Sequence, residues 1–364
     1  MNIPGVHIER IEGLGYTESE ARFLYIVAVF SGYFTLGQFR AFTGARFGRR
    51  PTSFAQKLIG RGHARICGQA RRASLFHLFS RTIYGQMDKD NLRNRKRHSL
   101  AFMRTRLALL DFVLANQDLT YFETEQEKVN YFCDALSISR EHLPATVYEG
   151  ATPDQKTIRY FVDKFPLFLA PSLPTVPPVV TFSYVDAGLE RPSNFASYLA
   201  TYRPLFRQLS SFRFVYIAAK QAYIYGVGER FRSIVQRPLE ADVSHEILRY
   251  FQVRKKWDNH EYVIPVANDL EFLKDALERY RKEDSIERLY QSWCRGELAG
   301  SQLRAQISQR VPKQAIVFDT YLVPTDRRNS AGDAGWGDEC MKDTDHCGRQ
   351  GSRHLDGDAN ALRS

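Results

Sequence analysis

Side chains that could contact a nucleic acid are concentrated between residues 49 and 61. Pro51 suits the first turn of a helix, because its missing N–H is not needed there. Phe54, Leu58 and Ile59 recur at helical spacing and should form a buried stripe. The opposite face would then offer hydroxyl, amide and cationic groups to phosphates and base edges. The DNA contacts expected from this helix and its flanks are Arg49, Arg50, Thr52, Ser53, Gln56, Lys57 and Arg61.

The positive charge of the chain is concentrated around this helix. Residues 39–110 hold 17 Lys and Arg against two acids, a net charge of +15. The whole chain of 364 residues has a net charge of +10, so the other 292 residues carry −5. A surface that faces a polyanion is expected to have this charge distribution. An acidic protein partner would satisfy the same electrostatics, so a protein-binding module stays open as an alternative.

Two preceding helices and a following hairpin should position the helix. The segments Thr17–Glu20 and Thr35–Gln38 are capping boxes, and each should begin a helix with apolar residues at helical spacing. His63–Cys67 and Ser74–Ser80 have the character of two short strands joined by a turn. Three short helices and a basic-tipped hairpin are the element order of a winged helix-turn-helix. The hairpin tip adds two expected DNA contacts, Arg71 and Arg72.

Residues 15–110 resemble the winged helix-turn-helix of the replication-relaxation group of mobile-element proteins, and MarR-like regulators more generally. The residues that carry the resemblance are Leu24 and Tyr25, Leu36 to Phe42, Arg50 to Ile59, and Gly62-His63-Ala64-Arg65. The resemblance implies a DNA-binding protein that accompanies plasmids and integrated elements. It also implies a second half similar to a nuclease-like α/β fold.

The expected fold class is α+β: an N-terminal winged helix-turn-helix, a small α/β domain and a disordered C-terminal tail. Val179 to Ala218 has the length of a strand–helix–strand crossover, and the composition beyond Thr325 is poor in apolar residues. The expected segments are 15–90 for the DNA-binding domain, 91–117 for a connecting helix, 118–310 for the α/β domain and 325–364 for the tail. Further helices are expected at 125–136, 195–209 and 268–296, and strands at 157–165, 179–185, 212–218 and 223–227.

A metal-dependent nuclease is the alternative function. Such an enzyme needs acids on neighbouring strands to hold Mg²⁺ and activate water. Asp163 and Asp186 lie near strand ends and would be the metal ligands, with Glu190 nearby. The lysine expected soon after the second acid is absent from Val185–Gly188, and Lys220 follows only after the next strand. Acids at strand ends also cap turns, so the pattern leaves open a degenerate, non-catalytic nuclease-like fold and another α/β domain that binds a partner or ligand.

The remaining motifs are weaker evidence for a function. Tyr225–Glu229 has two glycines but neither a dinucleotide nor a phosphate-loop fingerprint. Cys340, Cys347 and two nearby histidines match no familiar zinc spacing. No catalytic residue, metal or cofactor is therefore expected. The five cysteines are scattered, and neither a signal peptide nor a membrane span is evident, which favours the cytoplasm.

The sequence thus predicts a sequence-specific duplex DNA-binding protein, a transcriptional or replication regulator of a bacterial mobile element. The expected partners are double-stranded DNA and a second copy of the chain, because paired half-sites multiply affinity. The helix 91–116 would be the connector or dimer element, and the α/β domain would bind an effector or mediate oligomerisation.

Overall fold

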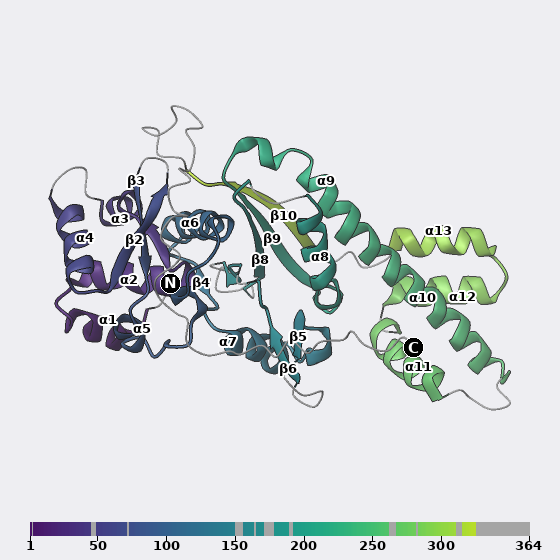
Figure 1. Cartoon of the computed structure of the whole chain (residues 1–364). Coiled ribbons are helices and arrows are strands. Elements are labelled where there is room, and N and C mark those ends of the chain that lie inside the picture. The colour runs from purple at the N-terminus through teal and green to yellow at the C-terminus, as the bar shows by residue number, and fades with distance from the viewer. Residues whose placement is uncertain are drawn as a thin grey trace, which may run out of the picture.

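The computed structural model describes residues 1, 3–44, 49–70, 73–149, 156–163, 165–170, 178–188, 192–261, 267–281, 283–310 and 315–324. These residues form a mixed α+β fold, as expected. Figure 1 shows α4 (Arg50–Gly60) at one end, a bundle of helices from α10 (Arg237–Asp258) onward at the other, and a five-stranded sheet between them. The expected disordered tail, 325–364, lies outside the described residues.

Three of the four helices of the N-terminal unit, residues 3–78, begin where the sequence indicates, and the first helix, α1, was not expected. Thr17 and Glu20 form a complete capping box, and Thr35 and Gln38 form another. Pro51 occupies the first turn of α4. The elements are α1 (Gly5–Glu12), α2 (Glu18–Phe30), β1 (Tyr33–Thr35), α3 (Leu36–Thr43), α4, β2 (Ala64–Ala70) and β3 (Ala73–Leu78).

The three strands of this unit form an antiparallel sheet in the order β1-β3-β2. The expected hairpin of β2 and β3 is confirmed. Aromatic side chains fill the space between the sheet and the helices: the Phe39 and Phe54 rings stack at 4.1 Å and Phe34 stacks on Phe76 at 5.2 Å. These rings are fully or almost fully buried. α4 is therefore held on a rigid apolar core.

The prediction of a single long helix over residues 91–116 is wrong. The chain instead forms α5 (Arg81–Gly85), a 3₁₀ turn at Arg93–Arg95 and then α6 (Leu100–Ala115). Asn94 is buried, and its amide donates to the carbonyls of Ala28 and Val29 at 2.9 Å, which satisfies the end of α2. In that role Asn94 holds this stretch in a short 3₁₀ turn instead of a continuous α-helix. α6 packs against both α2 and the central sheet, so its apolar residues are used within the chain.

The central sheet has the order β10-β9-β8-β7-β4. β8, β9 and β10 are parallel, β7 is antiparallel to β8, and β4 is antiparallel to β7 and so runs in the same direction as the parallel strands. The expected crossover is confirmed, because α8 connects the parallel pair β8 and β9. The strands are β4 (Thr120–Tyr121), β7 (Phe168–Leu169), β8 (Val180–Asp186), β9 (Ser211–Ala218) and β10 (Ala315–Leu322), and the helices beside them are α7 (Glu125–Asn130) and α8 (Pro192–Phe206).

Two strands expected near this sheet differ in the structure. β6 (Lys156–Tyr160) covers the first part of the segment 157–165 and pairs with β5 (Ala145–Glu149) in a separate two-stranded sheet. Residues 223–227 do not form a strand, because Gln221–Ile224 is a 3₁₀ turn. Asp186 is the last residue of β8, and Asp163 follows β6.

The chain between β9 and β10 forms the helical bundle. The expected helix at 268–296 is two helices, which separate between Tyr280 and Asp284. The elements are α9 (Val227–Phe231), α10, α11 (Ala267–Tyr280), α12 (Asp284–Cys294) and α13 (Gly300–Arg310). Their core is centred on Tyr250, Phe251 and Tyr290. In the described part of the chain, none of the helices combines the length and apolar character needed to cross a bilayer.

Candidate nucleic-acid interface

The outward face of α4 carries neutral hydrogen-bonding groups. Pro51, Phe54, Ala55 and Leu58 are buried against the core. Thr52, Ser53 and Gln56 are exposed on the other side, where the sequence places them, and Arg49 is exposed just before the helix. Ile59 was expected in the buried stripe, but it is 45% exposed, because the helix turns its last apolar position toward solvent.

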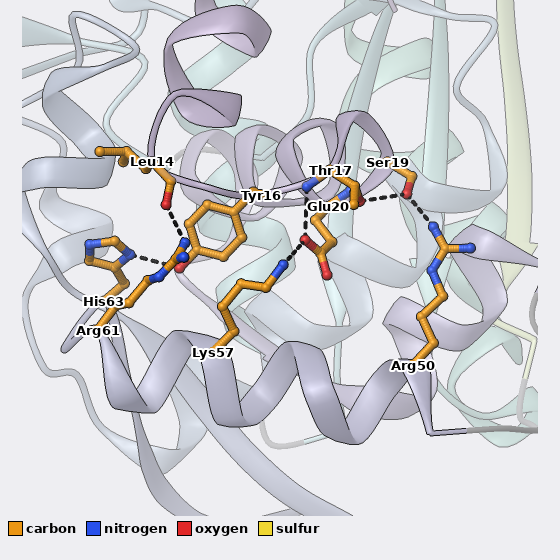
Figure 2. Close-up of polar contacts among 9 residues, drawn as sticks. All are labelled: Leu14, Tyr16, Thr17, Ser19, Glu20, Arg50, Lys57, Arg61 and His63. Carbon is orange, nitrogen blue, oxygen red and sulfur yellow. Dashed lines mark hydrogen bonds and ion pairs between the residues drawn. The ribbon is translucent and has the colours of Figure 1, made fainter.

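The expected cations Arg50, Lys57 and Arg61 lie on a different part of α4, as Figure 2 shows. All three project from one flank of the helix toward the start of α2 and the connection before it. Lys57 Nζ is 2.6 Å from Glu20 Oε2, and Arg50 donates to Ser19 Oγ at 2.5 Å. Arg61 donates to the Leu14 carbonyl. The expectation that Lys57 shares the solvent face with Gln56 is not what the structure shows, because its ammonium group is directed at Glu20.

Glu20 and Tyr16 are the residues of this region that the sequence-based site did not include. Glu20 Oε2 accepts from the Thr17 backbone N–H at 2.9 Å and also from Lys57, so one carboxylate both caps α2 and binds α4. The Tyr16 ring lies 5.3 Å from Lys57 Nζ and 5.2 Å from the Arg61 guanidinium carbon. Both residues hold the flank of α4 in place. The capping box was the only sequence signal for Glu20.

A buried hydrogen bond anchors the end of α4. Tyr16 Oη is 2.7 Å from His63 Nδ1. Burial raises the pKa of Tyr16 to about 12, and burial together with nearby Arg61 lowers the pKa of His63. At neutral pH the phenol is protonated and the imidazole is neutral, and the tautomer of His63 decides which of the two groups donates. This bond should therefore persist across the physiological pH range.

The remaining cations extend the positive surface beyond α4. Arg71 and Arg72 lie outside the described residues. Arg65 is exposed on β2, with its guanidinium 5.1 Å from the Phe79 ring. Lys96 is also exposed, whereas Arg95 is partly buried and donates to the Asp90 carbonyl at 2.7 Å. The run from Arg93 to His98 is thus partly structural rather than a uniform charged face.

The two candidate metal ligands have other partners. Asp163 accepts from Tyr202 Oη at 2.5 Å and from the Phe165 backbone N–H at 2.9 Å. Asp186 accepts from Tyr216 Oη at 2.6 Å and from the Gly188 backbone N–H at 2.7 Å. Each carboxylate therefore closes a turn two residues long and receives a tyrosine hydroxyl. Among the described residues, no group of three His, Cys, Asp or Glu side chains could hold a metal ion, and Glu190 lies outside them.

Comparisons with known proteins add no relative: no family model, no curated protein and no solved structure matches this chain.

The ion pair between Glu20 of α2 and Lys57 of α4 leads to a prediction about stability. We expect Glu20→Gln to lower the free energy of unfolding by about 1–2 kcal/mol, because a buried, charge-assisted contact to Lys57 is replaced by a neutral one. Urea unfolding measures the loss. The matched control is Glu18→Gln, two residues earlier, where an exposed carboxylate lies 3.7 Å from Arg22. That control should stay within about 0.5 kcal/mol of the parent. Equal losses in the two variants would contradict a role for Glu20 in holding α4.

Proposed function

We propose that residues 15–90 are a winged helix-turn-helix domain that binds duplex DNA sequence-specifically, with α4 as the recognition helix. The observation that carries the proposal is the outward face of α4, where Thr52, Ser53 and Gln56 are exposed within the segment that holds all the excess positive charge. The element order and the β1-β3-β2 sheet support the proposal, because a helix, short strand, two helices and a hairpin make up this type of domain.

We assign different roles in DNA binding to the different faces of α4. Gln56 can bond an adenine edge through both the oxygen and the nitrogen of its side-chain amide, and Ile59 can contact a thymine methyl group. Arg49 and Arg65 are placed to contact phosphates. Arg50, Lys57 and Arg61 fix the direction of α4 through Ser19, Glu20 and the Leu14 carbonyl. Base recognition would thus depend on neutral groups, and affinity on the surrounding cations.

The biological role we propose is regulation of transcription or replication in a bacterial mobile element. It rests on the resemblance of residues 15–110 to the replication-relaxation group. Such regulators act on paired half-sites, which requires two copies of the recognition helix. The central sheet and the helical bundle would then serve oligomerisation or effector binding.

Salt dependence tests DNA binding. Affinity for random duplex DNA should fall steeply as salt rises, because each phosphate contact releases counterions. Arg49→Ala should weaken binding to all sequences and reduce the log–log salt slope by about 1. Fluorescence anisotropy with a labelled duplex measures both. Arg288→Ala, an exposed arginine of α12, is the matched control and should leave the slope unchanged. Binding that is absent at low salt, or insensitive to salt, would overturn the proposal.

A further inference from the structure

The β5–β6 hairpin stands apart from both sheets. Among the residues that the structure describes, its two strands pair only with each other, and every residue of β5 is exposed. Val147 and Ile158 lie opposite one another in the register and are 54% and 51% exposed. A two-stranded hairpin has little stability of its own, and an exposed apolar cross-strand pair is a feature that a further strand commonly covers.

The hydrogen-bond phase of the hairpin determines which backbone groups point outward. The Phe161 N–H donates to the Pro144 carbonyl at 3.0 Å, immediately beyond the paired residues. Antiparallel pairs alternate between bonded and non-bonded, so Val147 and Ile158 form a non-bonded pair. The N–H and C=O of Ala145, Val147 and Glu149 therefore point away from β6. Among the described residues, no group hydrogen-bonds the backbone of Val147 from that side.

The two outer edges of the hairpin differ. On β6 the outward N–H of Tyr160 already donates to Glu125 Oε1 at 2.7 Å, and Arg159 pairs with the same carboxylate at 2.8 Å. Charged residues and a covering helix are usual protections of an edge strand. β5 has no lysine, proline or bulge, and its register is unbroken. β5 is therefore the open edge of the hairpin.

We propose that β5 pairs with β5 of a second copy of this chain, antiparallel, about a two-fold axis at Val147. The outward groups of Ala145, Val147 and Glu149 then meet their counterparts in register, and the hairpins join in the order β6-β5-β5-β6. Each Glu149 lies opposite an Ala145, and each Tyr148 opposite a Thr146, so no like charges face each other. The two Val147 and two Ile158 side chains form one apolar row. The contact is isologous, as a two-fold dimer requires.

A second copy fits this edge better than an unrelated peptide, because the sequence of β5 is complementary to itself in this register. α6, which the sequence analysis put forward as a dimer element, packs against α2 and the sheet within the chain. The interface is small, so we expect a weak dimer that two DNA half-sites would strengthen. The inference rests on the proposed function only in what it says the dimer is for, and its test contains no DNA.

Sedimentation velocity of the full chain over a range of concentrations tests the pairing. The parent should show a monomer–dimer equilibrium with a dissociation constant on the order of micromolar. Val147→Pro removes an N–H that the hairpin itself does not use, so β5 and β6 can still pair. It should raise the dissociation constant at least about tenfold. Ile158→Pro is the matched control: it changes the opposite residue, whose N–H lies on the β6 edge, and should weaken the dimer less.

Circular dichroism and thermal melts check that both variants fold. A parent that stays monomeric at the highest concentration would overturn the inference, and so would equal dissociation constants for the two folded variants. Failure here would leave DNA binding by α4 unaffected, since that is measured separately by the salt dependence of anisotropy.

Discussion

Replacing Asp163 with alanine should lower the free energy of unfolding by about 3 kcal/mol or more, because it leaves buried cations without their counter-charge. Arg106 of α6 and Lys128 of α7 are only 4% and 7% exposed. Burial lowers the pKa of Arg106 to about 10 and also lowers that of Lys128, and the nearby Asp163 opposes both shifts. Arg106 donates to the Phe30 carbonyl at 3.2 Å, so the same cluster also satisfies the end of α2. Urea unfolding at neutral pH measures the effect.

The pH dependence of this variant has a definite sign. Without Asp163, the folded state should hold Lys128 with a pKa still further below that of the unfolded chain, about 10.4. The unfolded state then binds more protons, so the stability of Asp163→Ala should rise as the pH is raised toward that value. Asp134→Ala removes an exposed carboxylate and should change stability by less than about 0.5 kcal/mol at any of these pH values.

A second substitution at residue 163 distinguishes a structural role of Asp163 from a role as a metal ligand. Asp163→Asn keeps one oxygen acceptor, for either Tyr202 or Phe165, and loses the charge, so we expect a stability loss close to that of alanine. A nuclease would instead lose Mg²⁺-dependent DNA cleavage with little change in stability. An unfolding curve and a plasmid-cleavage assay on the same preparation distinguish these outcomes, and a fully stable Asp163→Asn protein would contradict the charge-compensation argument.

Local signals in the sequence were enough to predict three of the four helices of the N-terminal unit, α2, α3 and α4. The capping boxes at Thr17 and Thr35 and the proline at residue 51 act within one helical turn, so no tertiary information is needed to locate them. The break at Asn94 could not be predicted, because it depends on carbonyls some 65 residues earlier. α10 has mostly polar residues, and its buried positions contact two separate cores, so periodicity alone did not reveal it.

The candidate interface was predictable in composition but not in orientation. The residues Thr52, Ser53 and Gln56 follow from the phase of Phe54 and Leu58, whereas Lys57 lies at the boundary between the faces. Its position is decided by Glu20, 37 residues away in sequence and 2.6 Å away in space. The sequence assigns the Glu20 carboxylate to a capping box, and nothing in it indicates that the same group also binds α4. For this reason the sequence assigned Lys57, Arg50 and Arg61 to DNA, while the structure directs them at α2.

The triple variant Thr52→Ala, Ser53→Ala, Gln56→Ala should lose at least about a hundredfold in affinity for its specific duplex, because a bidentate contact alone contributes roughly 1–3 kcal/mol of discrimination. These side chains are exposed, so stability should change little. Affinity for random duplex and its salt slope should also be retained, because no cation is removed. A duplex selected from a random pool by the parent protein, followed by anisotropy titrations, measures both. Gln208→Ala, an exposed glutamine after α8, is the control. A triple variant that binds the selected duplex as tightly as the parent would show that α4 does not read the bases, and the positive charge of residues 39–110 would then serve only non-specific binding.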